Sequence, residues 1–165
     1  MDTFTHLIIT APSPGLAAVY QSQLDAIHSE LPYLQGCQIL CVADPMGMRI
    51  GSGGGTLNAL HHLDHLIGRG LLSNSKVAII HSGGDSKRAP FHTVCGKAWA
   101  SINATQDERL LANPLLMLIE ELRKFCSCIL RSSFSVGSIV VASSDVMLDI
   151  CSQGKHENNT IAIKA

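Results

Sequence analysis

The sequence has almost no net charge and few aromatic residues, and both shortages exclude classes of partner. Its 165 residues carry 12 Lys and Arg against 13 Asp and Glu, for a formal net charge of −1. Without a basic excess there is no electrostatic basis for binding nucleic acid or an anionic membrane. Aromatic residues make up 4% of the chain, which leaves few side chains for stacking on bases. Phosphate binding, if present, must come from a local site.

The sequence also lacks targeting, membrane and metal-binding signals. The N-terminus has no basic segment of the secretory type, and no apolar run approaches membrane-spanning length. No C-x-x-C pair is present, which argues against a zinc ribbon or a thioredoxin-like site. We expect a cytoplasmic protein whose six cysteines are reduced and mostly buried rather than joined in disulfides. These are Cys37, Cys41, Cys95, Cys126, Cys128 and Cys151.

Hydrophobic residues make up 46% of the chain, enough for one folded domain that buries roughly 70% of its unfolded surface. Short apolar runs at 7–10, 38–42, 77–80 and 137–142 predict strands, and helical patterns separate them. This alternation predicts an α/β domain: a three-layer, Rossmann-like fold with a mostly parallel sheet. We expect the domain to span 4–150 and to be incomplete at its C-terminus, with 151–165 a polar, poorly ordered tail.

Two of the predicted helices have clear starts. Ser13-Pro14 and Asn113-Pro114 each place a capping side chain directly before a proline, which is favoured at the first helical position. The first helix should run to Pro32, and the second over 115–125 should be largely buried, with Glu120 paired to Lys124. The predicted buried face of the first helix consists of Leu16, Val19, Tyr20, Leu24, Ile27 and Leu31.

A glycine-rich stretch at 51–56, GSGGGT, precedes the next predicted helix. Glycines before a helix N-terminus suit an anion or nucleotide, because unpaired N–H groups point outward there. Two named motifs do not fit. A P-loop needs Lys and Ser or Thr after its last glycine, and a dinucleotide fingerprint needs glycine where Thr56 stands. The alternative interpretation is a flexible entry loop.

The stretch VAIIHSGGDSKRAPFHTVCGK at 77–97 is the second candidate for a phosphate site. A buried strand leads into Gly83-Gly84, whose backbone can approach a ligand closely. Polar donors follow, and then Arg88 and Lys97 supply cations for phosphate oxygens. The alternative is an ordinary surface strand and turn.

Two further positions are candidates for metal ligation. Asp145 follows the predicted strand at 137–142, where ligands bind in open α/β sheets, although a turn-forming aspartate is an equal alternative. His61 and His65 share a helical face, but His62 stands where a zincin helix has glutamate. We therefore expect these histidines to be solvated or to lie at the edge of the core.

The stretches VADPMGMRIGSGGGTLNAL and IIHSGGDSKRAPFHTVCGKAW, in this order, resemble the N-terminal region of L-fucokinases and GDP-fucose pyrophosphorylases. The second also resembles the Gly-Gly-x-Gly-Thr-Arg-x-x-Pro signature of sugar-phosphate nucleotidyltransferases. The resemblance covers 4 to about 150 and implies a GT-A-like domain. It implies Arg88 and Lys97 as catalytic cations and Asp145 as a ligand of Mg²⁺. The implied nucleotide contacts are Gly53, Gly54, Thr56, Gly83, Gly84, Asp85, Ser86 and Lys87.

The implied reaction is transfer of GMP from GTP to L-fucose 1-phosphate, with ATP as an alternative nucleotide. Lys87 and Ala89 depart from the usual family loop, which has a small residue at the first position or a bulky apolar residue at the second. Because the related proteins are much longer, we expect this chain alone to bind without turnover. The alternatives are a non-catalytic nucleotide-binding module of an L-fucokinase and a flavodoxin-like regulator. The sequence contains no flavin-contacting loop that would favour the latter.

Overall fold

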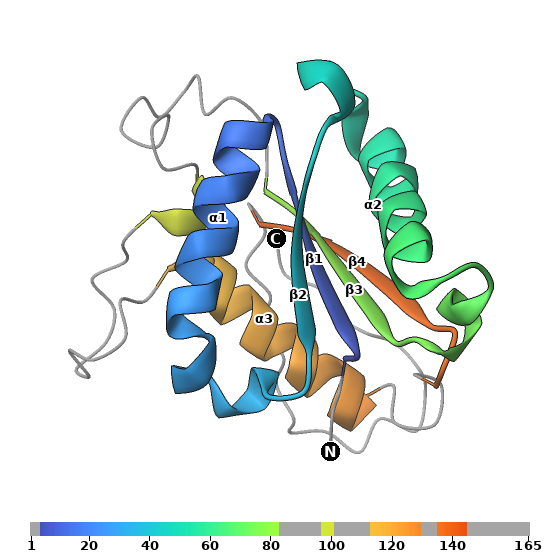
Figure 1. The fold of residues 1–165 in the computed structure, drawn as a ribbon. Helices are drawn as coiled ribbons and strands as arrows, with labels where there is room; N and C mark the ends of the chain where they lie inside the picture. The colour runs from blue at the N-terminus through green and yellow to red at the C-terminus, as the bar shows by residue number, and fades with distance from the viewer. Residues whose placement is uncertain (1–3, 83–96, 101–112, 130–134, 145–165) are drawn as a thin grey trace.

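The computed structural model describes residues 4–82, 97–100, 113–129 and 135–144. Four strands form one sheet in the order β2-β1-β3-β4, and every neighbouring pair is parallel. Helices α1 and α3 cover one face of the sheet and α2 covers the other (Figure 1). The predicted three-layer α/β arrangement is therefore confirmed. The elements are β1 (His6–Ala11), α1 (Pro14–Ile27), β2 (Gln38–Ala43), α2 (Gly51–Ile67), β3 (Val77–His81), α3 (Pro114–Lys124) and β4 (Ile139–Ser143).

The strand order changes direction at β1: the chain adds β2 on one side of β1 and then crosses back to add β3 on the other side. Strand β2 pairs with one side of β1 and β3 with the other, so that Thr10 faces Val42 on one neighbour and His81 on the other. In a parallel sheet the carboxyl ends of two such strands flank a crevice that helices do not fill. The ends of β1 and β3 are therefore the place where the fold itself provides a ligand site.

Both predicted helix caps are present. The Leu16 N–H donates to Ser13 Oγ at 3.3 Å, and the Leu116 N–H donates to Asn113 Oδ1 at 2.9 Å. The predicted extent of the first helix was wrong. α1 ends at Ile27, and 3₁₀ turns follow at His28–Glu30 and Pro32–Leu34. Leu31 is buried but lies outside α1, and Val19 is 50% exposed rather than part of its buried face.

The glycine-rich stretch is helix rather than entry loop. α2 begins at Gly51, so the glycines up to Gly55 form its first turns. Its N-cap residue, Ile50, makes no capping hydrogen bond with its side chain. Four glycines among the first five residues are poor helix formers. Contacts with the rest of the domain must therefore hold this end of α2 in place.

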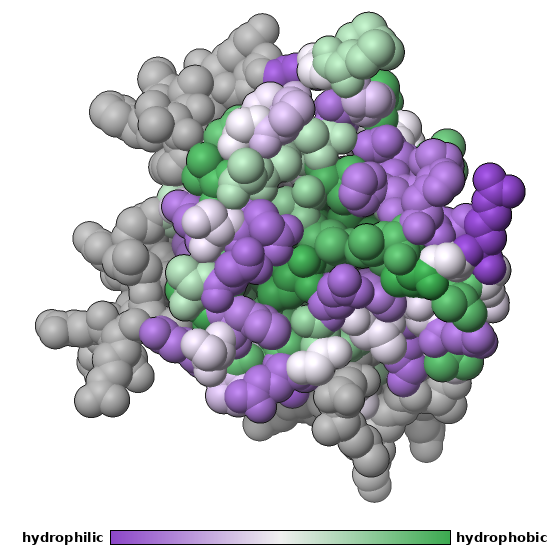
Figure 2. Space-filling view, viewed as in Figure 1, coloured by the Kyte–Doolittle hydropathy of each residue, from purple (hydrophilic) through white to green (hydrophobic). Residues whose placement is uncertain are grey.

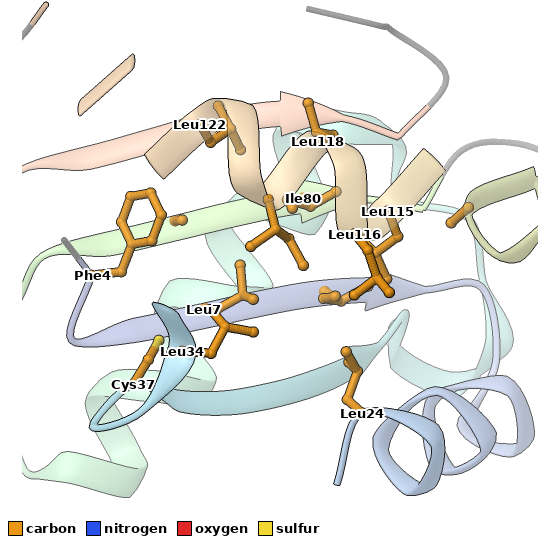
Figure 3. Packing of buried hydrophobic residues seen from close by; sticks show 14 of the residues in the cluster. Phe4, Leu7, Leu24, Leu34, Cys37, Ile80, Leu115, Leu116, Leu118 and Leu122 are labelled. Carbon is orange, nitrogen blue, oxygen red and sulfur yellow. The ribbon is translucent and has the colours of Figure 1, made fainter. Parts of the chain in front are cut away.

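Two apolar clusters join the layers. The larger lies between the sheet and helices α1 and α3, where Leu7 and Ile80 pack against Leu24 and Leu115 (Figure 3). The smaller lies under α2, whose buried residues include Leu63. Within the described part of the chain, no helix combines the length and apolar character needed to span a membrane. The members of the smaller cluster are Ile8, Val42, Ala59, Leu63, Val77 and Ile79.

Candidate functional site

A hollow of about 290 Å³ opens at the carboxyl end of the sheet, in the crevice that the topology predicts. Five structural pieces form its wall: the ends of β1, β3 and β4, the segment after β2, and the first turns of α2. Two of its lining residues, Asp44 and Arg49, carry charge. The other lining residues are Thr10, Ala11, Pro12, Gly51, Ser52, Gly55, His81, Ser82 and Ser143.

His81, the last residue of β3, links three of these pieces. Its Nδ1 lies 3.0 Å from Thr10 Oγ1 on β1, and its Nε2 lies 2.9 Å from Thr56 Oγ1 on α2. Its carbonyl oxygen accepts from the Ser144 N–H at 2.9 Å, just beyond β4. Both ring nitrogens are therefore occupied, and one side chain joins the sheet to the start of α2.

The hydroxyl groups determine which ring nitrogen carries the proton. Thr56 Oγ1 donates its single hydrogen to the Ser52 carbonyl oxygen at 3.0 Å. It must therefore accept from the His81 Nε2–H, which leaves Nδ1 to accept from Thr10. Burial lowers the pKa of His81, and the nearby Asp44 partly opposes this shift. The network therefore suits a neutral imidazole at neutral pH.

Position 55 is a place in this helix where the surroundings favour a glycine. It is buried, and a Cβ added there would lie 3.2 Å from His81 Cε1 and 3.5 Å from its Nδ1. The α2 backbone thus lies directly on the imidazole ring. Gly53 is different, because it is exposed and an added Cβ would meet no atom within 4 Å.

Among the residues predicted to contact nucleotide, the structure places Gly53, Gly54 and Thr56 in the first turns of α2, but the α2 residues that line the hollow are Gly51, Ser52 and Gly55. The Thr56 hydroxyl is already engaged with His81. Lys97 opens the 3₁₀ turn Lys97–Trp99, and its side chain is outside the described residues. The remaining predicted residues also lie outside them: Gly83, Gly84, Asp85, Ser86, Lys87, Arg88 and Asp145.

The described residues just before Gly83 and just before Asp145 nevertheless lie at the same edge of the sheet. Ser82 lines the hollow and immediately precedes Gly83, and Ser144 immediately precedes Asp145. Both serines are buried. Since β3 and β4 are parallel and paired up to His81 and Ser143, the described residues that precede the two candidate segments lie at the same edge of the sheet.

Sequence reasoning missed four functional groups in the wall of the hollow: Thr10, Asp44, Arg49 and His81. Three of them stand at or just after the ends of predicted strands, where α/β sheets bind ligands. That position was the available signal. What the sequence could not reveal is that the ring of His81 contacts residues 71 and 25 positions away.

A second hollow, of about 450 Å³, lies beside β2 between α1 and α2. Apolar residues are visible at the centre of Figure 2, where β2 lies between the two helices. Two of its polar side chains are occupied: Gln21 accepts from the Cys41 N–H at 2.9 Å, and Asn58 donates to the Ala43 carbonyl at 3.0 Å, while the exposed His62 also lines the hollow. This hollow therefore offers less chemistry than the one at the carboxyl ends.

The α2 histidines are solvated as predicted, and among the cysteines Cys37 and Cys126 are buried whereas Cys41 is partly buried. His61 and His65 are exposed, with ring centroids 4.5 Å apart, and the described residues contain no group of three potential metal ligands. Cys41 and Cys126 are free thiols. Burial raises the pKa of Cys41 to about 12 and that of Cys126 to about 11.

Comparison with known proteins identifies relatives for most of the chain. The model of the fucose pyrophosphorylase domain matches residues 70–164. The chain is 28% identical to a bifunctional fucokinase/GDP-fucose pyrophosphorylase of Arabidopsis thaliana, over 89% of this chain and 16% of that protein. It is 30% identical to a fucose-1-phosphate guanylyltransferase of Mus musculus, over 85% of this chain and 22% of that protein. For the Homo sapiens fucose-1-phosphate guanylyltransferase the identity is 34%, over 68% and 17% respectively.

The chain thus spans between 16% and 22% of the length of these curated relatives. No solved structure matches it significantly.

Proposed function

Because the chain belongs to the fucose pyrophosphorylase domain family, we propose that it forms the nucleotide-binding part of an enzyme that transfers GMP from GTP to L-fucose 1-phosphate. The product would be GDP-L-fucose, as in the salvage of free fucose. The observation that carries this proposal is the hollow at the ends of β1 and β3, where the glycine-rich start of α2 meets the strand leading to Gly83.

The start of α2 supplies the donors that a nucleotide phosphate needs. The first four N–H groups of an α-helix have no partner within the helix. In α2 these belong to the N-cap Ile50 and to Gly51, Ser52 and Gly53, of which Gly51 and Ser52 line the hollow. Small residues leave the N–H groups accessible, and the helix dipole adds favourable charge. Arg49 in the same wall adds a guanidinium.

In the proposed reaction a phosphate oxygen of the sugar phosphate attacks the α-phosphorus in line. The bond to the β-phosphate oxygen breaks, and pyrophosphate leaves without a covalent enzyme intermediate. The protein contributes positioning and charge stabilisation. We assign Arg88 and Lys97 to the triphosphate charge, and backbone N–H groups of Gly83 and Gly84, with Asp85, Ser86 and Lys87, to the phosphate oxygens.

The oxygen ligands of the hollow fit a magnesium ion. The Asp44 carboxylate and the hydroxyls of Ser52 and Ser143 line it, and Asp145 follows at the end of β4. Carboxylate and hydroxyl oxygens are the ligands that Mg²⁺ accepts alongside substrate phosphates. Asp145 is the residue that we assign to the ion, which when bound would neutralise phosphate charge.

Binding and turnover should separate in this chain. It spans at most 22% of the guanylyltransferases it matches, and the part of the site that holds the sugar is not among the residues assigned here. We therefore propose that the 165 residues bind nucleotide without turning it over. Pyrophosphate release from GTP and L-fucose 1-phosphate measures this directly. We also propose a cytoplasmic location, since Cys37, Cys41 and Cys126 are reduced thiols.

The decisive experiment is calorimetric titration with Mg–GTP, ATP and NAD. We expect Mg–GTP to bind and NAD not to, because neither glycine stretch has dinucleotide spacing. Arg88→Ala should weaken GTP binding by about 1.5–3 kcal/mol, the value of a charge-assisted hydrogen bond. The matched control is Arg69→Ala, an exposed arginine just after α2. Tighter binding of NAD, or an equal loss in both variants, would contradict the proposal.

A further inference from the structure

We propose that His81 is a positioning residue, which holds the start of α2 against the ends of β1 and β3 and thereby orients the N–H groups that receive the nucleotide phosphates. The inference concerns a residue that does not itself contact the reacting atoms. It rests on the proposed function for the identity of the ligand, but the geometry of the anchor stands independently of it.

His81 forms hydrogen bonds to β1, to α2 and to the residue after β4. The His81 backbone pairs with Thr10 on β1 and accepts from Ser144 beyond β4. Its ring then bonds to the Thr10 hydroxyl and to the Thr56 hydroxyl, which is itself tied to Ser52 in the first turn of α2. The sheet therefore holds the His81 ring in place, and the ring in turn holds the start of α2.

The start of α2 needs such an anchor. Its N-cap, Ile50, contributes no capping hydrogen bond, and glycines fill four of its first five positions. Glycine is the poorest helix former apart from proline, because it loses the most backbone freedom on folding. A helix start of this composition frays unless tertiary contacts hold it. The contacts found near this end include the Thr56–His81 bond, the packing of Gly55 on the His81 ring, and the bond from Asn58 to the Ala43 carbonyl.

A histidine suits the position because its two nitrogens play opposite roles at fixed separation. Nε2–H donates to Thr56 while Nδ1 accepts from Thr10, and the flat ring leaves room for the Gly55 backbone. A phenylalanine would fill similar space and bond to neither hydroxyl. His81 also precedes Gly83 by two positions in the sequence.

The test is a double-mutant cycle on the full 165-residue chain. The variants are His81→Phe, Thr56→Val and the pair together, with Thr56→Ser as the conservative rescue that keeps the hydroxyl. His65→Gln, an exposed histidine further along α2, is the matched control. Thr56→Val preserves side-chain shape, so the contribution of the Thr56 hydroxyl can be judged on Thr56→Val and Thr56→Ser even if His81→Phe does not fold.

The first readout needs no ligand. Amide hydrogen exchange at 55–59 reports the hydrogen bonds to the first turns of α2. Each single variant should speed this exchange at least about three- to tenfold, the equilibrium effect of losing one hydrogen bond. The effects of the two single variants should be less than additive in the double variant, because both remove the Thr56–His81 bond, although each also removes one other bond. Additive effects, no effect, or failure of Thr56→Ser to restore slow exchange would overturn the proposal.

The second readout is titration with Mg–GTP. His81→Phe and Thr56→Val should weaken binding by similar factors without an additive loss. Thr56→Ser should recover most of the binding that Thr56→Val loses, and His65→Gln should bind like the original chain. If the original chain binds no GTP, the proposed function fails, and the exchange cycle alone decides the role of His81. If GTP binds and the variants bind equally well, His81 does not position the phosphate donors and the proposal is overturned.

Discussion

Alanine at Gly55 and at Gly53 separates the two roles that glycine plays in α2. Both positions lie in the same helix, two residues apart, and neither has a positive φ. Gly53 is exposed, with no atom within 4 Å of an added Cβ, whereas the Cβ at Gly55 would lie 3.2 Å from His81 Cε1. The added methyl group would therefore lie in solvent at position 53. At position 55 it would lie against the His81 ring, which two hydrogen bonds hold.

The expected free energies follow from these surroundings. Alanine is favoured over glycine inside a helix by about 0.5–1 kcal/mol, so Gly53→Ala should raise the free energy of unfolding by about that amount. Gly55→Ala has the same gain, but the His81 ring must shift by a few tenths of an ångström. Overpacking of this kind costs about 1–3 kcal/mol. We expect Gly55→Ala to be the less stable of the two by about 1–3 kcal/mol.

Urea unfolding followed by circular dichroism measures both variants, with equal m-values as the check that only stability changed. The difference between the variants cancels the common helix propensity and isolates the contact with His81. Equal stabilisation by both alanines would refute the reasoning, because it would mean that the ring yields without cost. In that case the Thr10 and Thr56 hydrogen bonds would not hold His81 in place.

Three further predictions concern the framework around the site. Asn113→Ala should lower the free energy of unfolding by about 1–2 kcal/mol, and by more than Ser13→Ala, because the Asn113 cap is buried and its bond is shorter; thermal unfolding compares the two. Gln21→Met should cost about 1–3 kcal/mol in a urea titration, since it leaves the Cys41 N–H and the Ile39 carbonyl unpaired at the edge of β2. Iodoacetamide at pH 8 should label Cys41 and Cys126 in the unfolded chain but scarcely in the folded one. The reason is that burial raises both pKa values, so that the reactive thiolate forms only as the pH rises toward them; mass spectrometry after digestion measures the difference.

The features that sequence reasoning predicted correctly are local ones. Ser13 and Asn113 cap helices because a side-chain oxygen reaches an N–H three residues away, and the proline after each prefers the first turn. The Glu120–Lys124 pair, at 3.3 Å, is likewise one helical turn apart. Strands read from short apolar runs were also found, within a residue or two at their ends.

The failures come from tertiary structure. Helical periodicity assigned Val19 and Leu31 to the buried face of the first helix, but α1 ends at Ile27 and the chain continues in 3₁₀ turns. Leu31 is then buried from a different backbone conformation, and Val19 is left half exposed. A periodic pattern does not reveal where packing ends a helix. It therefore does not define which residues near the two helix ends belong to the buried face.

The glycine stretch at 51–56 shows the same limit at the candidate site. The stretch was interpreted as a loop before the helix, with nucleotide contact favoured over a flexible entry loop. The loop assignment was wrong, because the low helix propensity of glycine is a weak preference that tertiary contacts overcome, and nucleotide contact stays a prediction. The compensating contacts come from His81, 25 residues from Thr56 and 71 from Thr10, so no local pattern could reveal them. Yet the position of His81 was readable: it is the last residue of the central strand, at the edge where parallel sheets bind ligands. Residues that end such strands and carry two hydrogen-bonding groups are therefore candidates for positioning roles, even where the glycines beside them fit no named motif.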